Sequence, residues 1–467
     1  MKSYFVSAGF ILFLVTSLIS SCKKDVAQDP VSAYEDGEEY SGGKNITVFD
    51  ATSFAFNHSL PILSDSDETK FSVGNSFNRN NWVIAPSSTV GRDGLGPLYN
   101  ALSCSGCHNL DGRGQPPLPG EATISMVYKL SSPGTGIHGE PLGVTNFGDQ
   151  LNNRAIPGVT TEGDVNISYI EVPGSYPDGT TYSLRQPTYT FQNSALNGVM
   201  YSPRVAPKMT GTGLMDAIAE GTILANADEN DANGDGISGR PNYVWDYVKN
   251  TTALGRIGWK AGQPSVKQQV AHAFSNDIGI TSSLFPDENL SGTEVGLYAS
   301  LPNGGTPEIS DDIFNQVYFY TSTLAMPGRR DFKDADVLLG KTLFTQTGCV
   351  KCHVPKMQTG THPDVAYLNN QTIFMYSDLL LHDMGSGLAD GRPEFNATGN
   401  EWRTAPLWGV GLIKAVNNHE FLLHDGRARG VEEAILWHGG EAISIKTNFT
   451  KLSKDDRARL IKFVESL

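Results

Sequence analysis

The feature that most constrains this chain is a short motif that occurs twice. Cys104-Ser105-Gly106-Cys107-His108 places two thiols three positions apart with a histidine directly after them, and Cys349-Val350-Lys351-Cys352-His353 repeats the arrangement. Two such thiols can form thioether bonds to the vinyl groups of one haem, while the adjacent imidazole binds its iron. The sequence therefore predicts two covalently bound c-type haems. The predicted haem residues are Cys104, Cys107 and His108 for the first, and Cys349, Cys352 and His353 for the second.

Zinc sites and redox-active dithiols also use paired cysteines, so both are alternatives. The chain has five cysteines, and the two motifs contain all of them except Cys22. No further thiols are left to complete a zinc shell of four cysteines, and a disulfide framework has nothing to build on. Haem attachment is therefore the favoured interpretation, and it points to electron transfer or oxidation chemistry.

The amino terminus predicts export. Lys2 precedes the apolar run 8–19, which is too short to span a bilayer but has the length of a signal-peptide core. Small residues then lead into Cys22, as in the lipobox where bacterial lipoproteins are cleaved and acylated; ordinary cleavage with a spare thiol is the alternative. We expect residues 1–22 to be a lipoprotein signal peptide ending at an acylated Cys22. The mature protein would be anchored in the bacterial cell envelope, at the outer membrane, facing the periplasm or the cell surface.

The length of the chain favours several domains. A chain of 467 residues is too long for one core, and its 50 glycines and 25 prolines indicate many loops. We expect a flexible tether over 23–70, a first haem domain over 71–330 and a second over 331–467. The predicted fold class is mainly α, with two cytochrome c-like haem domains in tandem and a β insertion in the first. Alternating apolar stretches predict the inserted strands at 124–130, 166–172 and 182–191.

An internal repeat supports the idea of duplication. Arg204-Val205-Ala206-Pro207 is followed by Gly211-Thr212-Gly213-Leu214, and the same pattern returns as Arg403-Thr404-Ala405-Pro406 followed by Gly409-Val410-Gly411-Leu412. Each copy lies downstream of its own haem motif. Such self-similarity indicates that one structural unit occurs twice.

A second iron ligand for the C-terminal haem can be sought by helical spacing. Val431, Ala434, Ile435 and His438 fall at i, i+3, i+4 and i+7, so His438 belongs to a buried apolar stripe. An imidazole that points into a haem pocket is a ready iron ligand. Two alternatives stay open, a hydrogen-bonded core histidine and ligation by Met384.

The first haem lacks an equally clear second ligand. Gln269 is the inward polar residue of the helical pattern over 266–273, whereas His272 lies away from the centre of that face and is expected at the surface or between domains. An iron with no second protein ligand can bind peroxide. Met209 and Met215 are the alternatives that would close the site.

One loop resembles a calcium site. Asp231, Asn233 and Asp235 place side-chain oxygens at positions 1, 3 and 5, with a glycine at position 6 and the carbonyl of Ile237 at position 7. Position 12 is Asn242 rather than a glutamate, so the loop is incomplete unless Asp228 or Asp246 supplies the missing ligand. One Ca²⁺ is therefore a candidate ligand, and a solvated turn is the alternative.

These motifs together resemble a family, the bacterial dihaem oxidoreductases named as thiol oxidoreductases or peroxidases, which are relatives of the dihaem cytochrome c peroxidases and MauG. The resemblance covers the chain from about Trp82 onward. Two departures are clear: the peroxidase segment FWDGRA is absent from the first unit, and no free thiol of the mature chain supports a thiol oxidoreductase. The most specific segments are Leu98-Tyr99-Asn100 before the first motif, residues 255–261, and His424-Asp425-Gly426-Arg427-Ala428 continuing to His438.

The resemblance implies roles for individual residues. The position that carries the sixth ligand of the electron-donating haem in the peroxidases falls on His438. Gln269 matches a glutamine that assists peroxide cleavage, and Asp277 is the nearest acid for the partner role. Trp259 matches a tryptophan near the route between the haems. A calcium ion between the two haem regions is also implied, which favours the loop over 231–237.

The sequence thus predicts an exported dihaem c-type cytochrome that acts as a peroxidase-like oxidoreductase. Electrons are expected to pass from the C-terminal haem to the N-terminal haem, with an envelope protein as donor or acceptor and peroxide as the small oxidant. A non-catalytic electron carrier and a redox accessory of an iron-uptake system are the alternatives. The net charge of -15 leaves no basic stripe for nucleic acid.

Overall fold

A computed structural model describes residues 1–2, 34–298 and 300–467 of the protein. The apolar run 8–19 and Cys22 lie outside the described residues, so the signal peptide and the lipid anchor stay predictions. None of the helices in the described part is long and apolar enough to cross a membrane.

The molecule is a mixed α and β structure. The expectation of a mainly α fold with two cytochrome c-like domains in tandem is wrong, because 29% of the structure is helical, 18% is strand, and the strands form many small sheets. Several of these sheets join remote segments: β1 (Thr47–Val48) pairs in parallel with β10 (Met326–Pro327), and β2 (Leu98–Tyr99) pairs with β4 (Arg154–Ala155). Strands of two residues carry no periodicity in the sequence, so only tertiary contacts define them.

The elements follow one another in an irregular order. The helices are α1 (Asp65–Arg79), α2 (Cys104–Cys107), α3 (Thr212–Asp216), α4 (Glu220–Leu224), α5 (Val266–Ala273), α6 (Thr293–Tyr298), α7 (Asp311–Ser322), α8 (Ala335–Thr347), α9 (Ile413–Asn417), α10 (Val431–Trp437), α11 (Ile443–Lys451) and α12 (Lys454–Ser466). The remaining strands are β3 (Met126–Ser131), β5 (Val165–Ser175), β6 (Thr181–Phe191), β7 (Met200–Val205), β8 (Tyr243–Asp246), β9 (Thr251–Leu254), β11 (Met357–Gln358), β12 (Thr372–Ile373), β13 (Leu381–Asp383), β14 (Glu401–Arg403), β15 (Phe421–Leu422) and β16 (Ala428–Arg429).

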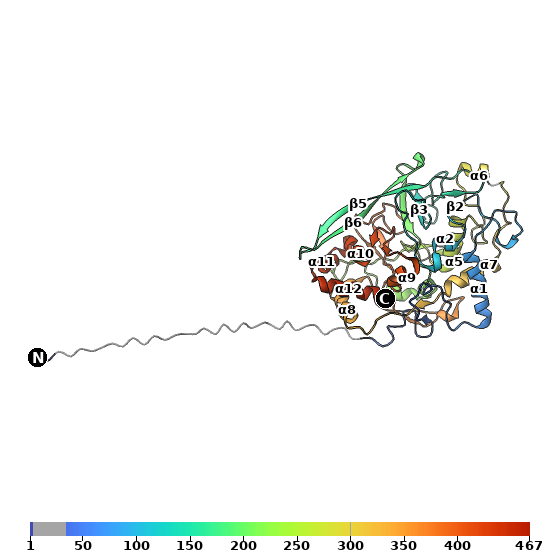
Figure 1. Ribbon diagram of the computed structural model, residues 1–467. Coiled ribbons are helices and arrows are strands. Elements are labelled where there is room, and N and C mark those ends of the chain that lie inside the picture. Colours follow the sequence, from blue (N-terminus) through green and yellow to red (C-terminus); the bar gives the residue numbers. More distant parts are fainter. Residues whose placement is uncertain (3–33, 299) are drawn as a thin grey trace.

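The longest strands form the hairpin β5–β6, which Figure 1 shows running across the molecule toward α10 and α11. Together with β3, it confirms the strands that the alternating stretches predict. The hairpin contacts the C-terminal half of the chain: the Tyr176 hydroxyl donates to Glu432 at 2.7 Å, and Arg457 donates to Asp178 at 2.8 Å. The predicted insertion therefore packs against α10 and α12 of the C-terminal half.

Two helix pairs each meet at a close glycine contact. Helix α1 packs on α7, and α8 packs on α12, on different sides of the molecule (Figure 1). Each pair meets at a glycine: a Cβ at Gly74 would lie 2.2 Å from the Gln316 carbonyl oxygen, and one at Gly340 would lie 2.1 Å from that of Arg459. Such short distances require glycine, because any side chain would push the two backbones apart.

The repeated glycines of the sequence have a matching role. Gly213 and Gly411 occupy corresponding positions in the two copies of the repeat. A Cβ at Gly213 would lie 2.0 Å from the carbonyl oxygen of Ser322 at the end of α7, and one at Gly411 would lie 1.9 Å from that of Glu465 near the end of α12. The internal repeat therefore marks two equivalent backbone contacts.

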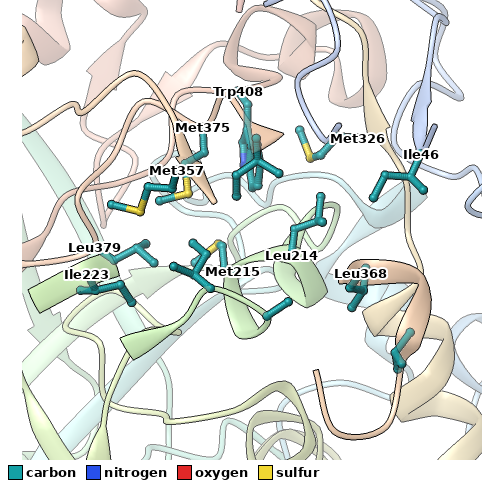
Figure 2. Packing of buried hydrophobic residues seen from close by; sticks show 14 of the residues in the cluster. Ile46, Leu214, Met215, Ile223, Met326, Met357, Leu368, Met375, Leu379 and Trp408 are labelled. Atoms are coloured by element: carbon teal, nitrogen blue, oxygen red, sulfur yellow. The ribbon is translucent and has the colours of Figure 1, made fainter. Parts of the chain in front are cut away.

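The largest buried apolar cluster of the described residues draws on both halves of the chain. Figure 2 shows Leu214 and Met215 from α3 facing Met357, Met375 and Trp408 from the second half. Residues 34–70, which the sequence assigns to the tether, also contribute to this cluster through Ile46 and Leu60. The cluster thus crosses the predicted domain boundary at 330, which stays a prediction.

Candidate functional site

The first haem motif lines a cavity of about 450 Å³. Helix α2 carries both thiols on the cavity wall, and the backbone N–H of His108 donates to the Cys104 carbonyl at 2.9 Å. The Nδ1 atom of His108 lies 2.7 Å from the carbonyl oxygen of Pro207. Since a carbonyl only accepts, Nδ1 carries the proton and Nε2 has its lone pair free to bind a metal.

The thiols of this motif do not suit a zinc site or a redox dithiol. Burial raises the pKa of Cys104 and of Cys107 to about 12, whereas metal binding and disulfide exchange both need a thiolate. Among the described residues, one group of three side chains lies close enough together to hold a metal ion, and it is elsewhere, at Cys352, Asp378 and His382. The donor set therefore fits thioether attachment better than a metal shell.

Polar side chains from α5 and the π-helical turn Phe274–Ile278 lie in the wall of the same cavity. Gln269 and Asp277 are both in this wall, as is Met209. Gln150 donates to the Asp277 carboxylate at 2.7 Å, and burial raises the pKa of Asp277. The structure thus brings together His108, an amide and an acid.

The second haem motif lines a separate cavity of about 260 Å³, and His438 lies in the same wall as His353. His353 holds its Nδ1 2.9 Å from the Tyr376 carbonyl, and His438 holds its Nδ1 2.7 Å from the Ala434 carbonyl. Both Nε2 atoms are therefore free. Burial, together with the nearby His438, lowers the pKa of His353 to about 4, and burial also lowers the pKa of His438, so both imidazoles stay neutral and able to bind a metal.

Trp259 lies between the two cavities. It belongs to both walls, and its indole N–H donates to the Val205 carbonyl at 2.9 Å, which fixes the ring. The Arg113 guanidinium lies 5.0 Å from the ring centroid. The residues shared by the two walls are Pro207, Lys208, Thr212, Ile257, Gly258 and Trp259.

Two cavities, each with its own CxxCH motif, agree with the comparison to known families. Residues 34–467 match the family described as di-haem oxidoreductase, putative peroxidase. The chain belongs to this family. None of the curated proteins matches the sequence.

For this dihaem oxidoreductase, membership implies two haem groups, and each cavity supplies residues that fit one. In each, two half-buried thiols lie beside a histidine whose Nδ1 is hydrogen-bonded to a backbone carbonyl. The covalent c-type linkage itself stays a prediction from the CxxCH spacing. The methionines divide between the cavities: Met209 lines the first, whereas Met215 and Met384 line the second.

His272 lies differently from the expectation that it is at the surface or between domains. It lines the first cavity, with 27% of its side chain exposed, and Asn276 donates to its ring at 3.3 Å. Burial lowers its pKa to about 4. The apolar stripe of α5 is a poor guide here, because polar as well as apolar residues of the helix line the cavity, over a wider arc than the stripe.

The sequence also gives no indication of His382, which lines the second cavity. Its ring is held between two carboxylates, Asp378 at 2.9 Å and Glu441 at 2.9 Å, which raise its pKa despite its burial. Its Nδ1 is also 3.6 Å from the Cys352 sulfur. Only the folded structure reveals this group, because His382 and Glu441 are 59 residues apart in the sequence.

In the predicted calcium loop, the side-chain oxygens accept hydrogen bonds from backbone N–H groups of the same loop. Asp231 and Asn233 both accept the N–H of Asp235 at 2.9 Å, and Asp235 accepts the N–H of Ile237 at 3.0 Å. Lys351, from within the second haem motif, lies 3.1 Å from the Asp235 carboxylate. Calcium binding by these residues stays a prediction.

Proposed function

We propose that this dihaem oxidoreductase is an exported c-type cytochrome with peroxidase-like activity. The observation that carries the proposal is the asymmetry of the two cavities. One wall holds two neutral histidines with free Nε2 atoms, His353 and His438. The other holds His108, whose Nε2 is free, together with the Gln269 amide and the half-buried acid Asp277.

At the first site, the side chains of the chain have distinct tasks. Bound haem supplies iron for electron transfer and for cleavage of a peroxide O–O bond. Cys104, Cys107 and His108 hold it. The Gln269 amide orients a small oxidant, and Asp277, whose pKa is raised by burial, holds a proton for the departing oxygen. Gln150 fixes the Asp277 carboxyl group at 2.7 Å.

At the second site, Cys349, Cys352, His353 and His438 provide a closed set of ligands, which suits electron exchange with an envelope protein rather than substrate binding. Trp259 touches both cavities and is our candidate for the connection between them. The direction of electron flow, from the C-terminal to the N-terminal site, follows from placing the closed site at the entry and the open site at the substrate.

A non-catalytic electron carrier is the second candidate function. Met209 and His272 both line the first cavity, and ligation by either would close the iron to peroxide. The location in the envelope and the acylation of Cys22 belong to the proposal on the strength of the sequence over 8–22. Calcium at Asp231, Asn233, Asp235 and Ile237 belongs to it in the same way.

Low-temperature electron paramagnetic resonance of the purified ferric protein, before and after hydrogen peroxide, tests the proposal. We expect one high-spin haem whose signal disappears with peroxide, and one low-spin haem. Two low-spin signals that peroxide leaves unchanged, in both the fully oxidised and the half-reduced protein, would overturn the peroxidase and leave the electron carrier.

A further inference from the structure

Three cationic side chains gather at the second cavity without a carboxylate partner. Arg113, Lys208 and Arg403 all line its wall, and Lys208 also lines the first cavity. Arg113 and Arg403 are buried, at 7% and 8% exposed, and Lys208 is half-buried. They come from three separate segments of the chain, so tertiary folding alone brings them together.

Each of the three donates only to backbone carbonyls. Arg113 donates to Phe421 at 2.8 Å and to Leu423, Arg403 donates to Gly258 at 2.8 Å, and Lys208 reaches Pro406 at 3.4 Å. Within the described part of the chain no ion pair joins any of them to a carboxylate. Asp425 and Asp378 act on Arg113 and Arg403 only through longer-range attraction.

The first cavity shows the usual arrangement by contrast. Lys129 lies 3.3 Å from Asp149, and Arg204 and Arg392 lie 2.6 Å and 2.9 Å from Glu394. Buried cations are normally neutralised in this way, because an unpaired buried charge is costly. The cluster at the second cavity is therefore incomplete without an anion.

The lack of a carboxylate partner among the described residues makes the charged form of Lys208 unfavourable. Burial, together with repulsion by Arg113 and Arg403, lowers its pKa to about 7. Burial likewise lowers the pKa of Arg113 and of Arg403 to about 10. An anion with two carboxylates would match three such cations.

We propose that Arg113, Lys208 and Arg403 form a binding site for the propionate carboxylates of the haem at the second motif. This inference rests on the proposed function only in requiring haem in the second cavity. The guanidinium groups offer paired N–H donors that match carboxylate oxygens, and Lys208 adds a charge on the side shared with the first cavity.

The other titratable groups that face this cavity lie outside the cluster of Arg113, Lys208 and Arg403. His382 is held by Asp378 and Glu441, and His424 lies beside Asp425 and stacks on Trp402 at 3.7 Å. Lys446 is half-buried and lies close enough to His438 to lower the pKa of that histidine. Lys446 thus offers a matched control for loss of a lysine charge from the same wall.

The test uses the holoprotein, whose mass is measured first to establish that two haems are attached. Resonance Raman spectroscopy of Lys208→Met, Lys208→Arg and Lys446→Met then reports on the propionate bending band of the second haem. We expect Lys208→Met to shift this band to lower frequency, as hydrogen bonds to the propionate are lost. Lys208→Arg should restore it, and Lys446→Met should leave it in place.

The reduction potential of the second haem gives an independent readout. Lys208→Met should lower it, because an uncompensated carboxylate beside the iron disfavours the reduced state, and Lys208→Arg should not. An unchanged Raman band in Lys208→Met, with a potential that follows the concentration of added inorganic phosphate at constant ionic strength, would overturn the inference and assign the cluster to a free anion. If the unsubstituted holoprotein did not react with peroxide while the band behaved as expected, only the proposed peroxidase would be overturned and the propionate site would stand.

Discussion

At the scale of single residues, the ligand role of His438 is the sharpest prediction. Its Nδ1 is hydrogen-bonded to the Ala434 carbonyl at 2.7 Å, so its free Nε2 would be available as a ligand for a haem bound in the second cavity. We expect His438→Ala to convert the second haem from low spin to high spin and to leave the spectrum of the first haem unchanged. His424→Ala, which alters another histidine of the same wall, is the control and should keep the low-spin signal. An unaltered spectrum in His438→Ala would point to Met384 instead.

Asp277 is predicted to act in proton transfer. Replacement by asparagine keeps the shape of the side chain and a group that Gln150 can contact, but removes the ionisable carboxyl. We expect peroxide turnover to fall by about 100-fold or more, because a positioned acid or base typically contributes that much. Steady-state kinetics with unchanged haem spectra check this. The exposed Asp287→Asn variant is the matched control, and equal rates for both variants would remove Asp277 from the reaction.

Glu162 is predicted to destabilise the protein at neutral pH. It is 5% exposed, and burial raises its pKa to about 9. Because the folded-state pKa is raised, the stability it contributes is present below about pH 4.5 and is lost as the pH rises toward 9. Glu162→Gln should therefore raise the free energy of unfolding at pH 8 by about 2 kcal/mol and leave it nearly unchanged at pH 4. Denaturant titrations at the two pH values measure this, and an equal effect at both would contradict it.

Residue-level prediction from the sequence works where the pattern is local. The CxxCH motifs need no tertiary information, and the spacing from Val431 to His438 directs attention to a histidine that caps α10 and lines the second cavity. By contrast, nothing near Lys208 or His382 in the sequence marks them as cavity residues. Their neighbours in the structure come from segments that are distant in the sequence, and local sequence patterns do not predict such long-range contacts.

At the scale of elements, the glycine contacts between helices should be essential. In Gly340→Ala the new Cβ would lie 2.1 Å from the Arg459 carbonyl oxygen, so α8 and α12 must separate. We expect a loss of about 3 kcal/mol in unfolding free energy, the upper part of the range for overpacking. Gly221→Ala in α4 has nothing within 4 Å of its new Cβ and is the matched control. It should be neutral or slightly stabilising, since alanine favours helix.

The same scale explains why the fold class was mispredicted. The strands of the hairpin β5–β6 have 11 residues each and contain the alternating stretches 166–172 and 182–191, from which the sequence predicts them. Strands such as β1 and β10 contain two residues each and pair across nearly the whole chain, as Thr47 does with Met326. Propensity and periodicity have nothing to act on in so short a segment. Many strands of this mixed fold are therefore short segments that sequence patterns do not distinguish from irregular loops.

At the scale of the whole molecule, the two halves share a core. Leu214 and Ile223 from the first half are buried against Leu379 and Trp408 from the second (Figure 2). The hairpin adds a second connection, through Tyr189, whose hydroxyl donates to Asp425 at 2.9 Å. The surroundings of each haem motif therefore depend on residues of the other half.

This shared core predicts that the two haem regions unfold together. Leu214 is 1% exposed, so Leu214→Ala should leave a cavity and cost about 3 kcal/mol. Thermal unfolding followed separately at the two haems should show one transition, shifted to lower temperature by the same amount at both. Leu297→Ala removes an exposed leucine of α6, at 63% exposure, and should shift neither signal. If Leu214→Ala lowered the transition at one haem only, the halves would be independent folding units and the shared cluster would not couple them.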